Sequence, residues 1–397
     1  MKPSSILQPF FRMSQFNIIQ DKRRKVALLD CIDALNNKAT LTLTGLGRRM
    51  QRGQVATKHN IKRVCRLLGN THLQRERSKI YAFVARHFLL KLINPVIIID
   101  WSPVKCVDKQ LLRASLPIGG RSITLYEEIF PESKLASPAA HKSFICKLKV
   151  IIPNECKPII MADAGFKVPW FKLIEKQGWY WLGRVRGNSY LTTNQKGYSC
   201  QDLFKKATYK AISLGAIELT NQHQFECNAV LYRKRSKGRH KKGYRGNISA
   251  STDSIKHAKN QREPWLLVSN LPEDIWPATR IVSLYKLRMQ IEESFRDTKS
   301  ERYGQSLSFT GSRCINRLEI LLLIGMLSQI AYLLIGKAAY IKGYYKQFQA
   351  NTERERRVLS YFYLGVEVAQ HERFNFSFKD ICIALSGLKA QAEAEFR

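Results

Sequence analysis

The longest uncharged apolar stretch of the sequence, ILLLIGMLSQIAYLLIG at residues 320–336, restricts the folds that this chain can adopt. A helix of this kind is covered either by lipid or by a protein core. The stretch is 17 residues long and contains Ser328 and Gln329, whereas a membrane-spanning helix usually needs about 20 mostly apolar residues. The sequence therefore favours a helix buried in a protein core. The N-terminus has no continuous apolar segment, and we expect no signal peptide there.

The chain carries far more positive than negative charge. Its 397 residues include 66 Lys and Arg against 31 Asp and Glu, a formal net charge of +35. This excess is larger than solubility requires. It indicates a polyanionic partner, either nucleic acid or an anionic membrane surface. The length suggests about two to four domains, and the 45% of apolar residues is enough for real cores.

The nine cysteines are dispersed from Cys31 to Cys382, and none forms a CxxC pair. This pattern is typical of a protein from a reducing compartment, and we expect a cytoplasmic protein without a disulfide framework or a zinc site.

Short apolar runs alternate with helical patterns in the first half of the chain. NPVIIID and KPIIMADAGF each contain a fully apolar run that ends on an Asp, which is typical of strands buried on both faces. Two strand-like runs flank Gly119-Gly120 and predict a hairpin. The order predicts an α/β fold in which helices pack on a mixed sheet. The predicted elements are strand, hairpin, helix, strand, helix and strand, at 95–99, 111–129, 139–152, 158–162, 168–177 and 179–187.

The sequence changes in character from about residue 187 to 277, where it is polar, turn-rich and strand-like. The run at 233–247 has eight Lys or Arg and no acid. It is either a solvated loop or a segment that follows a phosphate backbone. EPWLLVSNLP predicts a strand with Trp265 near its start. A helix over about 278–300 and the long apolar helix follow, and the last 50 or so residues are predicted to be helical, most clearly at 351–368.

The first 90 residues are predicted to be helical and end in a basic helix. LTLTGLGRRM and TKHNIKRVCRLLGN could form two short helices joined by a turn around Gly53. This arrangement fits a helix-turn-helix that reads DNA, and an ordinary solvated helix face fits equally well. The second helix has apolar residues on one side and basic residues on the other, among them Lys62, Arg63 and Arg66.

The helix predicted at YKLRMQIEESFRDTK, residues 285–299, has an unusual arrangement of polar residues. On one continuous helix, four of them would share a stripe within roughly 60° beside the apolar face. The spacing is compatible with surface ion pairs, and also with a metal-bound carboxylate next to a phosphate. The four residues are Tyr285, Arg288, Glu292 and Lys299.

Two aspartates and one glutamate are candidates for a metal site. Asp100 and Asp163 end apolar runs, where a carboxylate can cap the following turn but is costly to bury without a partner. Functional sites gather at strand ends in open sheets. Together with Glu292, these residues could hold two Mg²⁺ ions, which prefer hard oxygen ligands and can assist phosphoryl displacement.

On these residues the chain resembles the DDE transposases of bacterial cut-and-paste insertion sequences. Within them it is similar to the group marked by Tyr-x2-Arg-x3-Glu-x6-Lys, which Tyr285, Arg288, Glu292 and Lys299 match at every interval. IIIDWS and MADAGF resemble the motifs of the family's first and second catalytic Asp. The resemblance covers nearly the whole chain.

The resemblance implies an RNase H-like mixed-sheet catalytic core with a β-rich insertion and helical N- and C-terminal segments. We expect a helical DNA-binding domain, a core in two parts separated by the insertion, and a C-terminal helical segment. The corresponding ranges are 1–90, 91–186 with 278–340, 187–277 and 341–397.

The resemblance also implies roles for individual residues. Asp100, Asp163 and Glu292 would form a catalytic triad that binds Mg²⁺, with Mn²⁺ as a substitute. Phosphates of the transposon end would be held by Tyr285, Arg288 and Lys299. Trp265 would stack on a flipped base or pack as a strand residue, and both alternatives are open. Arg184 and Arg186 are further candidates for DNA contact.

The resemblance implies cleavage at the ends of the element, hairpin formation and resolution, and strand transfer. Double-stranded DNA would be bound by a homodimer on paired ends, in the bacterial cytoplasm and at the nucleoid. A nuclease with the same core and a catalytically inactive DNA-binding regulator are the alternatives.

Overall fold

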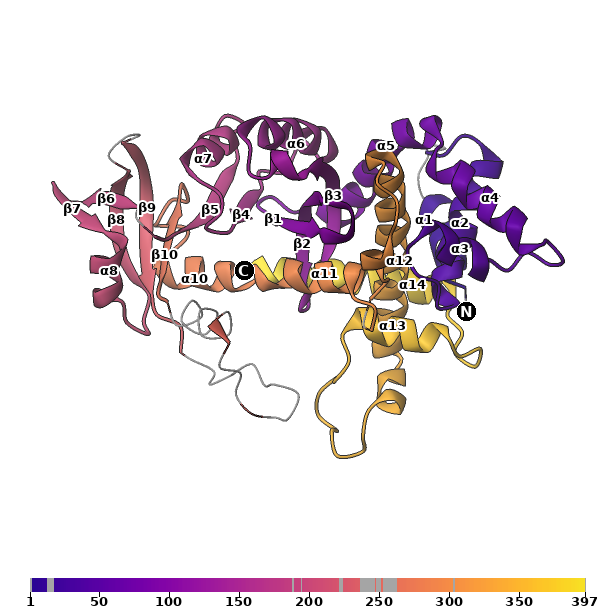
Figure 1. The fold of residues 1–397 in the computed structure, drawn as a ribbon. Coiled ribbons are helices and arrows are strands. Elements are labelled where there is room, and N and C mark those ends of the chain that lie inside the picture. The colour runs from indigo at the N-terminus through magenta and orange to yellow at the C-terminus, as the bar shows by residue number, and fades with distance from the viewer. Residues whose placement is uncertain are drawn as a thin grey trace. The chain divides into compact units, whose positions relative to one another are not determined.

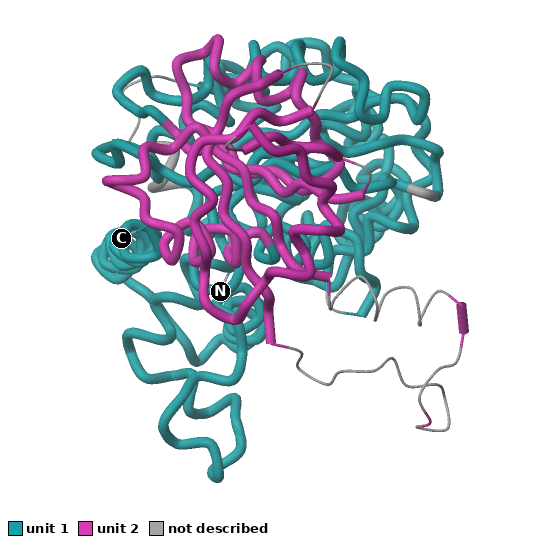
Figure 2. Tube along the Cα trace, turned by 90° about the vertical axis from the view of Figure 1, so that its left-hand side faces the viewer, with its two compact units in different colours: residues 1–157, 289–397 teal, residues 158–288 magenta. Residues whose placement is uncertain are grey.

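The computed structural model describes residues 2–12, 18–187, 189–193, 195–220, 224–235, 247, 251–252, 263–302 and 304–396 (Figure 1). The chain divides into two compact units. Unit 1 comprises residues 1–157 and 289–397, and unit 2 comprises residues 158–288 (Figure 2).

The N-terminal part of unit 1 is helical, as predicted. Side-chain oxygens of Asp21, Thr42 and Asn70 accept hydrogen bonds from the first turns of the helices that follow them and so fix where these helices begin. A turn at Gly53 joins the two short helices of the predicted pair, which pack against each other. The helices are α1 (Pro3–Arg12), α2 (Lys22–Asn36), α3 (Leu43–Arg49), α4 (Thr57–Leu68) and α5 (Thr71–Leu89).

Unit 1 also contains an antiparallel meander of β1 (Val96–Val104), β2 (Lys109–Ile118) and β3 (Arg121–Pro131), in the order β3-β2-β1. The predicted hairpin at Gly119-Gly120 is confirmed. Both glycines have positive φ, 57° and 84°, which a two-residue turn between such strands requires. A 3₁₀ turn, η1 (Lys105–Val107), joins β1 to β2, and another, η2 (Glu132–Lys134), follows β3.

The strand that carries Asp100 is longer than predicted. β1 continues to Val104, so Asp100 lies in the middle of this strand and not at its end. The prediction placed the end at Asp100 because the apolar run stops there. The ladder to β2 nevertheless continues through Trp101, Ser102 and Pro103, because pairing does not depend on apolar side chains.

Helices cover both faces of this meander. The helix α11 (Met289–Lys299) packs on one face, where Arg113 of β2 reaches two of its residues. Tyr126 of β3 points to the opposite face from its neighbour Glu127, and its ring contacts Phe144 of α6 (Pro138–Ile151) at 5.1 Å. The α6 helix therefore lies on the other face.

The long apolar stretch forms α12 (Ile315–Ile341), the central helix of unit 1. It is the one described helix that is long and apolar enough to cross a membrane, and its most apolar window is completely buried in the protein. The prediction of a buried core helix is confirmed. Around α12 pack α1, α2, α4, α5, β3, α13 (Tyr361–Ala369) and α14 (Phe378–Phe396).

The C-terminal segment is less helical than predicted. Within 351–368 only the part from Tyr361 onward is α-helical, and it begins where the side chain of Ser360 caps Tyr363 N. The highly charged sequence before it has no apolar side to bury. Short 3₁₀ turns lie at η3 (Leu307–Phe309) and η4 (Tyr344–Phe348).

The crossing of α12 and α13 depends on two glycines. A Cβ added at Gly336 would lie 1.8 Å from the carbonyl oxygen of Tyr361, and one at Gly365 would lie 1.9 Å from that of Tyr332. Because backbone atoms cannot yield as a flexible side chain does, we expect Gly336→Ala to destabilise unit 1 by about 3 kcal/mol. Urea unfolding would measure this loss. Gly311→Ala, where a Cβ meets open space, is the control, and equal stability of the two variants would contradict the prediction.

Unit 2 is built on a second set of strands, in the order β4-β5-β10-β9-β8-β6-β7. The pair β4–β5 is parallel, and the strand pairs described from β5 to β7 are antiparallel. The strands predicted around residues 158–162, 179–187 and 263–272 are confirmed. In chain order, the elements are β4 (Ile159–Ala162), α7 (Val168–Glu175), β5 (Tyr180–Val185), β6 (Tyr190–Thr193), β7 (Lys196–Ser199), α8 (Cys200–Lys206), β8 (Ile212–Leu219), β9 (Phe225–Tyr232), β10 (Trp265–Ser269) and α10 (Ala278–Lys286).

Aromatic stacking holds α7 on this sheet. The rings of Phe171 in α7 and Trp181 in β5 stack at 4.1 Å, and Phe225 of β9 lies 5.7 Å from Trp181. Trp181 Nε1 donates to Glu175 Oε1 at 2.9 Å, so the indole is buried with its polar group satisfied.

The single helix predicted over 278–300 is wrong. The chain forms α10 and α11, interrupted at Leu287 and Arg288, whose amides bond three residues back to Leu284 and Tyr285. Neither Gly nor Pro lies there to signal the interruption. Tyr285 and Arg288 thus belong to unit 2, whereas Glu292 and Lys299 belong to unit 1, so the predicted stripe of four residues does not run along one helix.

The boundaries of the predicted domains differ from those of the compact units. The domain ranges stay predictions. Unit 2 includes β4, α7, β5 and α10 in addition to the stretch predicted as an insertion. Most of the basic run at 233–247 lies outside the described residues.

Candidate functional site

Asp100 lies in a row of charged residues across the meander of unit 1. It is paired in register with Arg113 of β2, which is in turn paired with Glu127 of β3. Residues directly opposite on neighbouring strands point to the same face. Arg113 donates to Ser294 and Thr298 of α11, so this is the face that α11 covers. Asp100 is half-buried there, and its Oδ1 accepts from the Trp101 amide at 2.8 Å.

The α11 helix, which packs on this face, carries both Glu292 and Lys299. They are seven residues apart, about 20° apart on a helix, and this part of the predicted stripe holds within α11. Glu292 is exposed and Lys299 is half-buried. The Lys299 ammonium donates to Ser102 Oγ and to the Pro103 carbonyl oxygen, both at 2.6 Å, so it lies against β1 two residues beyond Asp100.

The surroundings of Lys299 favour its neutral form. Burial, and after it the nearby Arg113 guanidinium, lowers the pKa of Lys299 to about 7. Near neutral pH the side chain therefore changes readily between an amine and an ammonium group. An incoming phosphate would favour the ammonium form, because an opposite charge nearby stabilises a cation.

Asp163 directly follows β4 of unit 2, so its predicted place at a strand end is confirmed. Its Oδ1 accepts from the Gly165 amide at 2.8 Å, which closes the turn after the strand. The capping role that we considered for this residue is thus present. The carboxylate is half-buried and keeps a second oxygen for another role.

Four predicted DNA-contacting residues gather in unit 2 although the sequence separates them widely. Arg184 in β5 and Arg186 just after it both bind Glu263 Oε2, at 2.7 and 2.8 Å. Burial lowers the pKa of Arg184, Tyr285 and Glu263 oppose this effect, and Arg186 and Arg288 add to it. Tyr285 and Arg288 therefore lie close enough to influence Arg184, and the cluster combines three arginines with Glu263.

Trp265 belongs to the same cluster. Its ring contacts Tyr285 edge-on at 5.1 Å and Tyr232 at 5.8 Å, and Lys234 Nζ lies 5.5 Å from the ring centroid. Trp265 is half-buried, unlike the four residues that follow it in β10. An indole held by aromatic neighbours and partly open to solvent could stack on a base and could equally serve as a packing residue.

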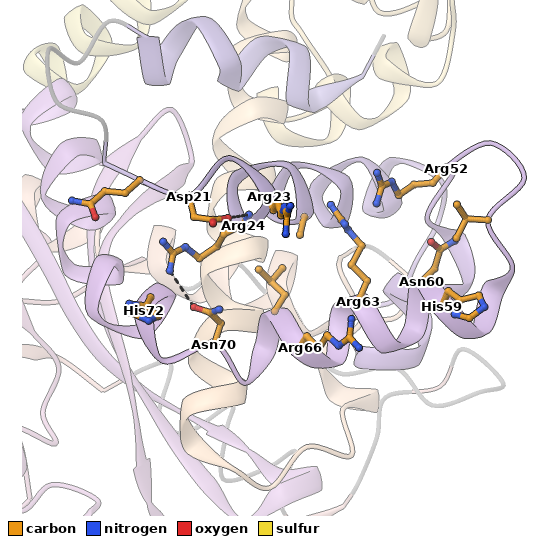
Figure 3. A pocket seen from close by; sticks show the side chains of 14 residues that line it. Asp21, Arg23, Arg24, Arg52, His59, Asn60, Arg63, Arg66, Asn70 and His72 are labelled. Carbon is orange, nitrogen blue, oxygen red and sulfur yellow. Dashed lines mark hydrogen bonds between the residues drawn. The ribbon is translucent and has the colours of Figure 1, made fainter.

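A basic groove of about 810 Å³ lies in the N-terminal helices of unit 1. Figure 3 shows Arg23 and Arg24 from α2 on one side and Arg63 and Arg66 from α4 on the other. Arg52 lies near the turn at Gly53, and Asp21 is the one acid among the lining residues. Of the predicted DNA-contacting residues, Arg63 and Arg66 line the groove, whereas Lys62 is exposed outside its lining.

Acidic residues fix some of these arginines in place. Asp30 Oδ2 forms ion pairs with Arg52 Nε at 3.4 Å and with Arg63 Nη2 at 3.3 Å. Arg24 reaches Glu76 Oε1 at 3.1 Å and Asn70 Oδ1 at 3.3 Å. No motif in the sequence singles out Arg23, Arg24 or Arg52. The run KRRK at 22–25 was the available signal, but its convergence with α4 depends on how the helices pack.

Each unit carries some of the predicted metal-binding carboxylates. Asp100 and Glu292 are hard oxygen donors carried by elements that pack together in unit 1, and Asp163 is the donor in unit 2. Their chemistry suits Mg²⁺ or Mn²⁺. No group of three or more His, Cys, Asp or Glu in the part of the chain that the structure describes is arranged to hold a metal ion.

Comparisons with known proteins identify the family. No curated protein matches the sequence. A solved structure described as a piggyBac transposase synaptic complex with hairpin DNA, determined by cryo-electron microscopy, matches with a TM-score of 0.41 and 13% identity, over 99% of this chain and 77% of that one. A likeness at this level supports no statement about function. The model of the transposase DDE domain matches residues 91–328, a range that includes Asp100, Asp163, Glu292 and Lys299. The chain therefore belongs to the family of transposases with a DDE domain.

Proposed function

We propose that the chain is a cut-and-paste DNA transposase of a bacterial insertion sequence, with an RNase H-like core and Asp100, Asp163 and Glu292 as its catalytic carboxylates. The observation that carries this proposal is the arrangement in unit 1, inside the range matched by the family model. The face of β1 that bears Asp100 is the face that α11 covers, and Lys299 of this helix bonds to Ser102 of β1.

The three carboxylates would hold Mg²⁺, or Mn²⁺ as a substitute. Such ions, when bound, stabilise charge on the attacking and leaving oxygens of a phosphodiester in an in-line displacement. The residues of the chain orient the DNA for this displacement. Lys299, anchored by Ser102 and Pro103, would bind a phosphate beside Asp100, because a compact ammonium group is a point charge suited to phosphate.

The cluster of unit 2 would bind the end of the element. Arg288 and Tyr285 would contact its phosphates, supported by Arg184 and Arg186. Trp265 would stack on a base turned out of the duplex. The proposed reaction begins with nicking, which exposes a 3′-hydroxyl. This hydroxyl attacks the opposite strand and leaves a hairpin. The hairpin is then reopened, and the 3′ ends are joined to target DNA. A homodimer would hold two paired ends.

The basic groove between α2 and α4 would bind the DNA backbone outside the cleavage site. We expect Arg66→Ala to weaken duplex binding about tenfold and to reduce the slope of log K against log salt concentration by about 1, because one phosphate contact is lost. Fluorescence anisotropy at several salt concentrations measures both quantities. Arg356→Ala removes an exposed arginine outside the groove, and the proposal fails here if this control has an equal effect.

An excision and joining assay tests the proposed function. A marker gene is placed between the two DNA segments that flank the coding sequence and is incubated with purified protein, Mg²⁺ and a target plasmid. A transposase releases the marker and joins its 3′ ends to the target. A nuclease with the same core would yield cut but unjoined DNA. A catalytically inactive regulator would bind the ends without cutting them.

A further inference from the structure

Arg113 is a buried charge in a strand whose neighbours are mostly apolar. It is 1% exposed and stands in the middle of β2. A charge taken out of water is costly unless it is paired and its hydrogen bonds are satisfied. The partners of Arg113 therefore show what the residue holds together.

The guanidinium has partners on two sides. Its Nε donates to Glu127 Oε2 at 2.8 Å, and one terminal nitrogen lies 2.6 Å from the same oxygen. The hydroxyl of Tyr81 in α5 donates to Glu127 Oε1 at 3.2 Å. On the other side, the two terminal nitrogens donate to Ser294 Oγ at 2.9 Å and to Thr298 Oγ1 at 3.1 Å.

These bonds fix both the rotation and the axial position of α11. Ser294 and Thr298 are four residues apart, so they mark one line along the helix, and the guanidinium is a rigid fork that binds both. The Phe295 ring lies over the same group at 4.9 Å. From Thr298 the network continues to Gln329 of α12 at 2.9 Å, which ties α11 to the central helix.

The side of α11 that bears Ser294 and Thr298 lies about 130° around the helix from the side that bears Glu292 and Lys299. Arg113 itself is the register partner of Asp100. One buried side chain thus connects the strand position beside Asp100 to the helix that carries the third carboxylate. A rotation of α11 would move Glu292 and Lys299 together relative to Asp100.

We propose that Arg113 is a positioning residue that sets α11, through Ser294 and Thr298, so that Glu292 and Lys299 meet the metal and phosphate beside Asp100. This inference rests on the proposed function. A contribution to stability alone does not require such a group, because buried ion pairs can often be replaced by apolar residues at no cost in stability.

The test separates α11 from Arg113 while the pair with Glu127 stays intact. The variant Ser294→Ala/Thr298→Val removes both acceptors. Ser294→Thr/Thr298→Ser, which keeps both hydroxyls, is the matched control. For full-length proteins we would measure the Mn²⁺ concentration that half-saturates the rise in unfolding midpoint, hydrogen exchange of the α11 amides without metal, and affinity for duplex DNA.

We expect the half-saturating Mn²⁺ concentration to increase about tenfold in the first variant and α11 to exchange faster, with DNA affinity within about twofold of wild type. The control should behave as wild type. A lower unfolding midpoint with unchanged Mn²⁺ dependence would show a purely structural role and overturn the inference. If the wild-type protein itself shows neither a Mn²⁺-induced shift nor cleavage, the proposed function fails instead.

Discussion

Asp100→Asn and Glu292→Gln are each expected to slow DNA cleavage by about 10³-fold, because each would remove a proposed metal ligand that contributes several kcal/mol to the transition state. This is the largest effect that the proposed function predicts. The substituted side chains keep nearly the same size, and Glu292 is exposed, so we expect the fold and the affinity for DNA to be retained. Single-turnover cleavage of end DNA in Mg²⁺, beside an anisotropy titration, measures the two properties separately.

Glu293→Gln is the matched control for Glu292→Gln. Glu293 is the next residue of the same helix, and it pairs with Arg121 at 3.3 Å and with Arg296. Partly exposed ion pairs of this kind contribute only about 0 to 1 kcal/mol, so cleavage should stay near the wild-type rate. Equal losses at positions 292 and 293 would contradict a specific role for Glu292.

DNA binding through Lys299 is expected to weaken as pH rises above 7. The free protein holds the pKa of Lys299 at about 7, so above this pH a proton must be taken up before the ammonium can bind a phosphate. The loss of binding free energy cannot exceed the contribution of one charge-assisted contact, which is about 2 kcal/mol or ~30-fold in Kd. Titrations between pH 6.5 and 9 would measure it. Lys299→Arg, which stays charged, should remove the dependence.

The same pKa predicts an opposite trend for folding. The pKa of Lys299 in the unfolded chain is about 10.5, so between pH 7 and 10 the unfolded state binds more protons than the folded state. Stability of the wild-type protein should therefore rise with pH in this window, by about 2 kcal/mol between pH 7 and 9, relative to Lys299→Met. A parallel change in affinity and stability would contradict the assignment.

Local sequence patterns predicted most of the elements correctly, and long-range contacts account for the errors. Apolar runs and Gly119-Gly120 were sufficient for the strands and the hairpin. The break at Leu287 and Arg288 has no local signal. It separates Tyr285, packed on Trp265 in unit 2, from Gln290, which bonds to the Ile118 amide and to Glu395 in unit 1.

The residue types of the candidate site could be predicted from the sequence, but the contacts that hold these residues in place could not. The spacing of Glu292 and Lys299 within a helix indicated a shared face, and α11 has that face. Arg113 was visible as a charge in LLRASL, but its role depends on the register of β2 with β1 and on the packing of α11. The arginines of the groove likewise converge through the packing of the helices, with Asp30 and Glu76 paired to three of them.

The central claim is that Asp100, Asp163 and Glu292 bind the same metal ions, and iron-directed cutting of the polypeptide tests it most directly. Fe²⁺ replaces Mg²⁺ in the full-length protein, and ascorbate with peroxide then generates radicals that cut the backbone beside the bound ion. The account predicts cuts near residues 100, 163 and 292, all suppressed by excess Mg²⁺ and lost together in Asp163→Asn. Cuts near residues 100 and 292 that persist unchanged in Asp163→Asn, with none near residue 163, would contradict it.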